Sequence, residues 1–422
     1  MEFPTLDSYP NLPSEASSQP TPFIVPLDAP HPIPSVVTNS LPIVIGTRNS
    51  KLALAQADLV RRLFECVHPS HPTSIQSMTT AGDQNLDRPL YLMGGKSLWT
   101  KELEVALLEG PVDLIVHSLK DMPTSLPPGC ELGAVLERED PRDALVIRKD
   151  LPFKSLDELP VGSVIGTSSV RRVAQLRRRF PQLQFQDIRG NLNTRFRKLD
   201  APDSPYTGII LAVAGLKRVD CADRISSFLS PPDLYYAVGQ GAIGIEICSA
   251  GAGVDEERTE VVRRLVRSLE HGPTALVCHA ERALLRTLEG GCSVPVGVTS
   301  NYVDLPMPCP WAPKARLTLT GVVTSVDGTK EVVMMRTADI CGPKDAVKLG
   351  CELAGELLAA GADAILEELN VVKRVEGDGT TDQMSRIGAV EAKTHIQIAA
   401  PADAQRTSIG ANENRSVVVL QA

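Results

Sequence analysis

Long apolar runs are missing from this 422-residue sequence, and none approaches the ~20 residues that a membrane span requires. Paired cysteines are missing as well, because the nine cysteines are odd in number, scattered and never arranged as C-x-x-C. Neither a disulfide framework nor a zinc site is therefore indicated. The pattern Cys66-x-His68-x-x-His71 is the nearest approach to ligand spacing, but it lies beside prolines and we expect no metal there. We expect a cytoplasmic protein without a membrane partner.

Lysine and arginine are missing from residues 1–41, which are rich in Pro, Ser and Thr. Transit peptides are Arg-rich and acid-poor, and secretory signals begin with positive charge, so neither fits this segment. We expect a disordered extension here. Beyond about Val372 the apolar periodicity is lost, and residues 372–422 are expected to form a disordered tail.

The arginines are unevenly distributed in a chain whose formal net charge is -8. They are densest between Arg171 and Arg197. Local basicity within an acidic protein indicates a specific small anion as the ligand, with nucleic acid as the competing hypothesis.

The stretch from Val112 to Pro123 carries the first candidate site. An apolar run, Leu114 to Val116, ends abruptly in polar residues, and a proline follows that cannot extend a central strand. Ligands of open α/β sheets bind beyond the carboxyl ends of the strands, so Lys120 and Asp121 are candidate site residues. A solvated turn is the alternative that this pattern leaves open.

Two other predicted strand ends have the same sequence. Val164-Ile165-Gly166-Thr167 matches Val44-Ile45-Gly46-Thr47 letter for letter, and both lead into a polar turn that carries arginine. Arg48 is placed at a strand's carboxyl end, and Ser50 either caps the following helix or binds a ligand. Two similar α/β domains facing each other across a cleft would use both loops for one ligand.

The second of these turns has the composition of an anion site. Thr167, Ser168 and Ser169 supply hydroxyls at a helix start, where free N–H groups attract anions. Cations in the first helical turn oppose the helix dipole, so Arg171 and Arg172 make more sense if an anion is shared there. Further along, Arg189 and Arg195 could converge on a carboxylate or phosphate, although a solvated surface stays open for any single arginine.

Gly94-Gly95-Lys96-Ser97 imitates the end of a phosphate-binding P-loop. That motif requires a glycine where Leu90 stands and a strand just before it, so we reject a nucleotide site. A loop in which Lys96 seeks an anion is the better interpretation.

The later chain predicts a return and a third unit. The glycine-dense stretch from Val238 to Ala242 and the strand after it return the chain to the first domain. A helix from Thr274 to Leu288 is followed by strands and a second long helix, with a surface insertion at 301–314. We therefore expect a disordered extension at 1–41 and a tail at 372–422. Between them we expect domain 1 at 42–138 plus 240–267, domain 2 at 139–239 and domain 3 at 268–371.

Taken together, the motifs resemble the porphobilinogen deaminase (hydroxymethylbilane synthase) family in order from about Ile43 to Glu368. The motifs are Ile45-Gly46-Thr47-Arg48-Asn49-Ser50, Gly95-Lys96-Ser97-Leu98, His117-Ser118-Leu119-Lys120-Asp121, Glu137-Arg138-Glu139-Asp140-Pro141-Arg142-Asp143, Gly166-Thr167-Ser168-Ser169-Val170-Arg171-Arg172, Arg189-Gly190-Asn191, Gly239-Gln240-Gly241-Ala242 and Glu289-Gly290-Gly291-Cys292. The resemblance implies two periplasmic-binding-protein-like, doubly wound α/β domains and a smaller C-terminal α+β domain.

The family implies an activity and a cofactor. Its members are transferases of heme and tetrapyrrole biosynthesis that join four porphobilinogen molecules head to tail, release ammonia, and free hydroxymethylbilane by hydrolysis. They carry a dipyrromethane cofactor on a cysteine thioether, which the resemblance places on Cys292. Two departures are Leu92, where many relatives have lysine, and Trp99, which replaces a phenylalanine.

The resemblance also implies roles for residues. Asp121 would be the catalytic carboxylate, which stabilises the cation left on a pyrrole when ammonia departs. Cationic and hydroxyl side chains would bind the acetates and propionates of the pyrroles, because forked guanidiniums suit carboxylates. The cofactor contacts would be Lys120, Thr167, Ser168, Ser169, Arg171, Arg172 and Arg189, and the substrate contacts Arg48, Ser50, Lys96, Arg195 and Arg218.

Two other classes of function remain as alternatives. A non-catalytic, two-domain anion-binding protein would share the fold and the strand-end arginines, but it would have no use for Asp121 or Cys292. Nucleic-acid binding through Arg171 to Arg197 would be steeply salt-dependent. We expect a monomer that binds porphobilinogen. We expect it to bind neither nucleic acid nor a metal.

Overall fold

The computed structural model describes residues 41–80, 100–288, 294–306, 314–368 and 415–421. The predicted N-terminal extension, apart from Leu41, lies outside these ranges, as does most of the predicted tail. Among the described residues, no helix is long and apolar enough to cross a membrane.

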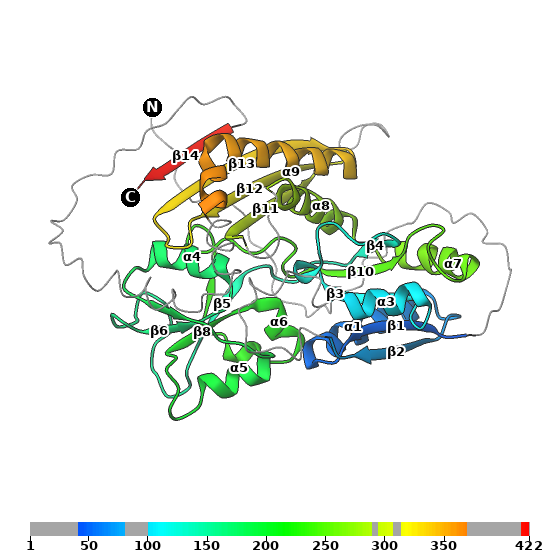
Figure 1. Cartoon of the computed structure of the whole chain (residues 1–422), viewed down its shortest axis with the longest axis horizontal. Coiled ribbons are helices and arrows are strands. Elements are labelled where there is room, and N and C mark those ends of the chain that lie inside the picture. Colours follow the sequence, from blue (N-terminus) through cyan, green and yellow to red (C-terminus); the bar gives the residue numbers. More distant parts are fainter. Residues whose placement is uncertain (1–40, 81–99, 289–293, 307–313, 369–414, 422) are drawn as a thin grey trace, which may run out of the picture. The chain divides into compact units, whose positions relative to one another are not determined.

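The first sheet has five strands in the order β2-β1-β3-β10-β4 (Figure 1). They are β1 (Ile43–Arg48), β2 (Thr73–Met78), β3 (Leu114–Ser118), β4 (Cys130–Val135) and β10 (Ile243–Cys248). Strands β1, β2 and β3 are parallel, and β10 is antiparallel to both β3 and β4. Apolar residues on both faces of these strands are buried, which requires helices on both sides.

Three helices cover the faces of this sheet. They are α1 (Lys51–Val67), α3 (Lys101–Glu109) and α7 (Glu256–Arg267). Ile45 packs with Phe64 of α1 and Val266 of α7, whereas Ile115 packs on the other face with Leu103 of α3. This unit is therefore doubly wound.

The second sheet repeats the first, with the order β7-β6-β8-β5-β9. Its strands are β5 (Asp143–Ile147), β6 (Val164–Gly166), β7 (Gln184–Gln186), β8 (Gly208–Ala212) and β9 (Ser227–Leu229). Helix α4 (Val170–Arg179) packs on one face, and α5 (Leu192–Leu199) and α6 (Val213–Arg218) pack on the other. Parallel β6, β7 and β8 are joined by antiparallel β5, as β1 to β3 are joined by β10.

Strand register places the turn that carries Lys120 and Asp121 and the turn that begins at Thr167 at corresponding edges of the two sheets. In the first sheet Ile243, which begins β10, pairs with Ser118, which ends β3. In the second sheet Asp143, which begins β5, pairs with Ala212, which ends β8. The chain therefore crosses between the two sheets at the edges where the parallel strands end. The chain has the expected α/β class, with two similar units of this topology.

The third unit is an antiparallel sheet with two helices, as the sequence pattern predicts. The order β11-β12-β13-β14 consists of β11 (Val296–Asp304), β12 (Ala315–Thr324), β13 (Lys330–Ile340) and β14 (Arg415–Gln421). Its helices are α8 (Gly272–Thr287) and α9 (Pro343–Leu357), and the chain kinks after α9 at Gly361, whose φ is 102°. Leu284, Leu319 and Leu353 lie in its core.

Two details differ from the sequence predictions. Residues 301–304, predicted as the start of an insertion, continue β11 and pair with β12. Residues 415–421, predicted as part of a disordered tail, form β14 along β13. The β-branched sequence Val417-Val418-Val419 suits a strand, but its partner is remote in the chain and local periodicity cannot reveal such pairing.

Gly241 lies in the crossing that returns the chain from β9 to β10, and this position should be intolerant of any side chain. Its φ is 90°, and a Cβ there would lie 2.1 Å from the Glu139 carbonyl oxygen. Gly251 is a matched control, since its φ is 74° and a Cβ would meet nothing within 4 Å. Each alanine substitution should cost about 1–2 kcal/mol through φ alone. We expect Gly241→Ala to lower the denaturant midpoint clearly more than Gly251→Ala, and equal effects would contradict this account.

Candidate active site

The turn that carries Lys120 and Asp121 is a single 3-10 turn, η3 (Leu119–Asp121), placed directly after β3. The Leu119 N–H donates to the Ala242 carbonyl at 3.0 Å, and the Leu119 side chain is buried. A Cβ on Gly239, whose φ is 71°, would lie 3.1 Å from Leu119 Cγ. Close packing of the crossing against Leu119 thus directs the next two residues to the sheet edge.

Lys120 is linked to the second sheet through one glutamine. Its Nζ donates to Gln240 Oε1 at 3.2 Å, and Gln240 Nε2 donates to Asp143 Oδ1 at 2.9 Å. Burial lowers the pKa of Lys120 to about 8, with Arg172 contributing in the same direction and Asp121 opposing. The amine is therefore a cation that the fold holds at an energetic cost.

Asp143 is the centre of a buried arginine pair. Its Oδ2 accepts from Arg171 Nη2 at 2.8 Å, and its Oδ1 accepts from Arg172 Nη2 at 2.7 Å. Burial raises the pKa of Asp143, but the two guanidiniums outweigh burial and hold it well below the ordinary value. The anion that we expected beside Arg171 and Arg172 is thus, in this structure, a carboxylate of the chain itself.

The hydroxyls of the second turn organise the turn itself. Ser169 caps α4, because its Oγ accepts from the Arg172 N–H at 3.5 Å. Thr167 Oγ1 accepts from the Ser169 N–H at 3.3 Å, and Ser168 Oγ donates to the Ile188 carbonyl at 2.7 Å. These contacts fix the backbone at the start of α4.

Arg189 and Arg195 approach the same region from the turn after β7. Arg195 Nε donates to the Gly190 carbonyl at 2.8 Å, and Arg189 Nε lies 3.7 Å from Asp187 Oδ2. Burial lowers the pKa of Arg195 to about 10, Arg172 lowers it further, and Asp187 and Asp121 oppose. Arg195 of the second unit therefore lies within electrostatic range of Asp121 of the first.

The remaining predicted side chains are distributed around these edges. Arg48 ends β1, and Ser50 caps α1 by accepting from the Ala53 N–H at 3.3 Å. Arg218 Nη2 donates to the Gly241 carbonyl at 2.6 Å, and burial lowers its pKa. Lys96 and Cys292 lie outside the described residues, as do Leu92 and Trp99.

Two residues of this cluster were missed by the sequence analysis. Asp143 and Gln240 were recognised only within longer motifs and received no role. Asp143 had a usable signal, because it is the one acid within β5, a strand whose other residues are all apolar. Gln240 had none, since its partners Lys120 and Asp143 lie 120 and 97 positions away.

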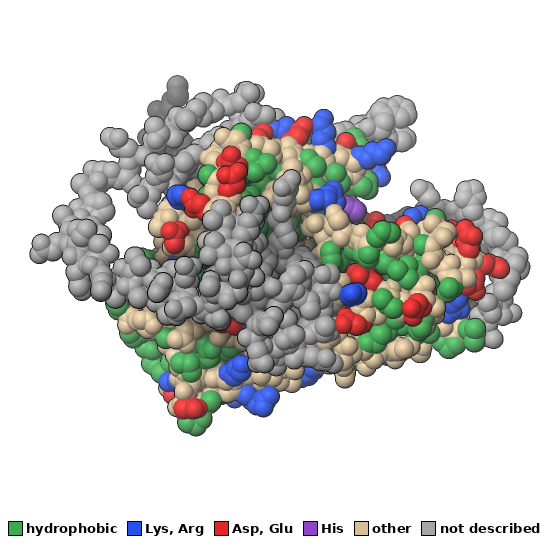
Figure 2. Space-filling model, viewed as in Figure 1, with side chains coloured by type: hydrophobic (Ala, Val, Ile, Leu, Met, Phe, Trp, Pro, Cys, Tyr) green, Lys and Arg blue, Asp and Glu red, His purple; other side chains and the backbone are tan. Residues whose placement is uncertain are grey.

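The arginine-rich stretch does not form one exposed basic surface. Arg171 and Arg172 are buried, and Arg177 and Arg178 donate to carbonyls at Val326, Gly328 and Thr329 of the third unit. On the face shown in Figure 2, the basic and acidic side chains that are described are interspersed rather than gathered in a stripe. The nucleic-acid hypothesis loses its main support.

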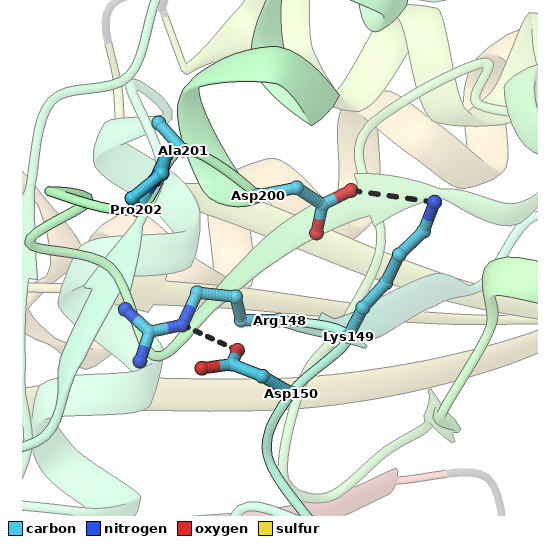
Figure 3. Close-up of a pocket in the computed structure, with 6 residues that line it drawn as sticks. All are labelled: Arg148, Lys149, Asp150, Asp200, Ala201 and Pro202. Atoms are coloured by element: carbon cyan, nitrogen blue, oxygen red, sulfur yellow. Dashed lines mark hydrogen bonds and ion pairs between the residues drawn. The ribbon is translucent and has the colours of Figure 1, made fainter.

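A surface pocket of about 280 Å³ lies at the opposite end of the second sheet (Figure 3). It is lined by Arg148, Lys149, Asp150, Asp200, Ala201 and Pro202. Arg148 and Asp150 point toward each other, as do Lys149 and Asp200, so the charges are already neutralised. Because the length of β5, about 15 Å, separates this pocket from Asp143, it is not part of the site. Within the described ranges, no cluster of His, Cys, Asp or Glu could hold a metal.

Asp143→Asn should destabilise the chain by about 3–5 kcal/mol, because two buried guanidiniums lose their carboxylate. Since the folded pKa of Asp143 lies below the unfolded value of about 3.9, this stability is present above pH 4 and is lost as the pH falls through the folded pKa. Denaturant unfolding should show a constant gap from wild type between about pH 5 and 7 that narrows toward pH 3.

The control for this experiment is Asp150→Asn. Asp150 pairs with Arg148 at the surface, and its side chain is 65% exposed, so removal of its charge should change stability little. A gap for Asp143→Asn that is no larger than the control's, or that widens toward acid pH, would contradict the arrangement described here.

The comparisons with known proteins agree in both parts of the chain. Residues 43–256 match the family model described as "Porphobilinogen deaminase, dipyromethane cofactor binding domain", and residues 275–359 match "Porphobilinogen deaminase, C-terminal domain". Among solved structures, the periplasmic aliphatic sulphonate binding protein SsuA of Escherichia coli is 13% identical, with a TM-score of 0.29 over 58% of this chain and 70% of that chain. That likeness is too low to support an argument.

Curated relatives are similar over most of their length. Porphobilinogen deaminase of Yarrowia lipolytica is 46% identical over 334 residues, which cover 78% of this chain and 94% of that protein. The proteins of the same name from Gloeobacter violaceus and Candida albicans are 48% and 43% identical, covering 79% and 83% of this chain and 96% and 99% of theirs. These names support the catalytic hypothesis over the non-catalytic alternative. The chain belongs to the porphobilinogen deaminase family.

Proposed function

We propose that this chain joins four porphobilinogen molecules head to tail, releases ammonia at each step, and frees the linear tetrapyrrole hydroxymethylbilane by hydrolysis. Such a transferase acts in tetrapyrrole and heme biosynthesis. Membership of the family supports the proposal. The observation that carries it is the η3 turn, which places Asp121 next to Lys120 and within electrostatic range of Arg195, two cations that burial destabilises.

The cationic cluster fits the acidic dipyrromethane cofactor of the family. Among the described residues, neither Lys120 nor Arg195 has a carboxylate within the 4.0 Å of an ion pair, although burial disfavours both charges. A ligand that brings several carboxylates would supply the missing countercharge. The residues that would hold it are Lys120, Thr167, Ser168, Ser169, Arg171, Arg172 and Arg189, with Cys292 as the attachment. When bound, the cofactor supplies a tethered pyrrole to which the first substrate is added.

Asp121 is proposed as the catalytic residue. As ammonia leaves the aminomethyl arm of porphobilinogen, positive charge develops on the substrate's pyrrole ring. A carboxylate near the ring N–H stabilises that charge and accepts a hydrogen bond from it. Leu119, which is buried and donates its N–H to the Ala242 carbonyl, anchors the η3 turn and so limits where this carboxylate can lie, and little reorganisation is needed when the charge appears.

The substrate carboxylates are assigned to the surrounding cations. We assign them to Arg48, Arg195 and Arg218, with Ser50 as an additional hydrogen-bond donor and Lys96 in the loop. Forked guanidiniums bind carboxylates in a defined orientation, whereas an ammonium acts as a point charge. The cations of both units would thus orient the acetate and propionate arms while Asp121 acts on the ring.

Three further predictions stay proposals. The domain limits 42–138 plus 240–267, 139–239 and 268–371 are supported by the grouping of strands into three sheets. A reducing, cytoplasmic location is supported by seven described cysteines that are all free thiols. A monomer is proposed as the working state.

Intact-mass measurement on the purified protein should reveal a covalent adduct of two pyrrole units. Cys292→Ser removes the only proposed thioether sulfur, so its mass should equal that of the bare chain. Cys66→Ser is the control, because Cys66 is exposed and free and should leave the adduct in place. An unmodified wild-type chain with full turnover would refute the proposed attachment.

Asp121→Asn should retain the fold and lose roughly 10²–10³-fold or more of kcat, the scale seen when one electrostatic catalytic contact is removed. Asp233→Asn is the control, since Asp233 is exposed and takes no part in the cluster. Porphobilinogen consumption and thermal midpoints should be measured together for both variants. Near-normal turnover in Asp121→Asn would show that another group performs this role.

A further inference from the structure

Two arginines on α8 bind the backbone immediately after Asp121. Arg282 Nη1 and Nη2 donate to the Met122 and Pro123 carbonyls at 3.3 and 2.6 Å. One helical turn further on, Arg286 Nη1 donates to the Thr124 carbonyl at 3.4 Å. Three successive carbonyls of the first unit are therefore held by one helix of the third unit.

Apolar contacts bring the same helix against the same turn. Leu119 and Met122, which flank Lys120 and Asp121, are buried in one cluster with Ala275 and Cys278 of α8. The start of β10 closes the other side, because a Cβ on Gly244 would lie 2.8 Å from Leu119 Cδ1. The η3 turn is thus enclosed between α8 and the start of β10.

Arg282 is unusual in what it binds. Its side chain is nine-tenths buried, and among the described residues no carboxylate lies within ion-pair distance of it. Burial accordingly lowers its pKa to about 10. A buried guanidinium without a carboxylate is expensive for stability alone, and an apolar side chain would fill the space at lower cost. Its distinctive property is a rigid fork that fixes two adjacent carbonyls.

The residue before Arg282 on α8 has a different task. Glu281 accepts from Arg138 Nη1 at 2.7 Å and from the Gly239 N–H at 2.8 Å, so it binds the segments where the chain crosses between sheets. Neighbouring positions on one helix therefore hold the crossing and the η3 turn in a common frame.

We propose that Arg282 is a positioning residue for Asp121, acting by fixing the carbonyls of Met122 and Pro123. The inference rests on the proposed role of Asp121 and assigns to α8 the task of holding that carboxylate in register with the cationic cluster. A displacement of about 1 Å at a reacting group can cost roughly 10²-fold in rate, so the loss of a backbone fork is sufficient to matter.

The test compares Arg282→Gln, Arg282→Lys and a matched exposed control, Arg316→Gln. Arg316 lies on β12, its side chain is 55% exposed, and it pairs with Asp339. For each purified full-length protein we would measure kcat and KM for porphobilinogen, the thermal midpoint, and hydrogen exchange of the backbone amides from Lys120 to Leu126. Exchange reports on the turn whether or not the chain turns over porphobilinogen.

We expect Arg282→Gln to lower kcat by about 10–100-fold, with KM within about threefold of wild type. Exchange should accelerate in the turn and not across the chain. Arg282→Lys, which keeps the charge but loses the fork, should recover part of kcat, and Arg316→Gln should behave as wild type. Unchanged exchange in the turn with kcat within about twofold of wild type would overturn the proposal, as would acceleration across all three units with a matching fall in thermal midpoint.

The proposed function can fail separately from this inference. If the wild-type chain consumes no porphobilinogen, the proposed function is wrong. Accelerated exchange confined to the η3 turn in Arg282→Gln would still show that Arg282 fixes this turn. If wild type is active and Arg282→Gln changes neither kcat nor exchange, only the positioning role is overturned.

Discussion

The site depends on one buried carboxylate. Asp143 takes a guanidinium from both Arg171 and Arg172 and, through Gln240, is connected to the amine of Lys120. Without it, the buried guanidiniums of Arg171 and Arg172 would repel each other and the nearby amine of Lys120. With it, part of the charge is balanced and the remainder is left for an acidic ligand. Arg171 and Arg172 can therefore serve as structural supports and as ligand donors within one network.

The topology explains why these groups meet. Each doubly wound unit delivers polar side chains where its parallel strands end, and the two chain crossings leave and enter at those same edges. Gly239 and Gly241, with φ of 71° and 90°, allow the second crossing to pass close to Leu119 and Glu139. The third unit then contributes α8, which contacts the crossing through Glu281 and the η3 turn through Arg282. Fold and chemistry thus share the same few backbone segments.

Much of this could be predicted from the sequence, because apolar runs that end in polar residues are local signals. The strand ends at Ser118 and Gly166 and the start of α4 belong to this class, and so does the capping role of Ser50. Pairings between remote residues could not be predicted. A helix start rich in arginine indicates that an anion is near, but it cannot show that the anion is Asp143 on the antiparallel strand β5. For the same reason, the pairing of β14 and the hydrogen bonds from Arg282 to the backbone after η3 had no local signature.

The most direct test of the central claim is an experimental structure of the purified protein with its pyrrole cofactor and porphobilinogen bound. The account predicts that carboxylates of the bound pyrroles lie within hydrogen-bond distance of Lys120 and Arg195, and that a pyrrole N–H donates to Asp121. Pyrrole carboxylates directed away from both cations, with Asp121 facing solvent or another cavity, would contradict it.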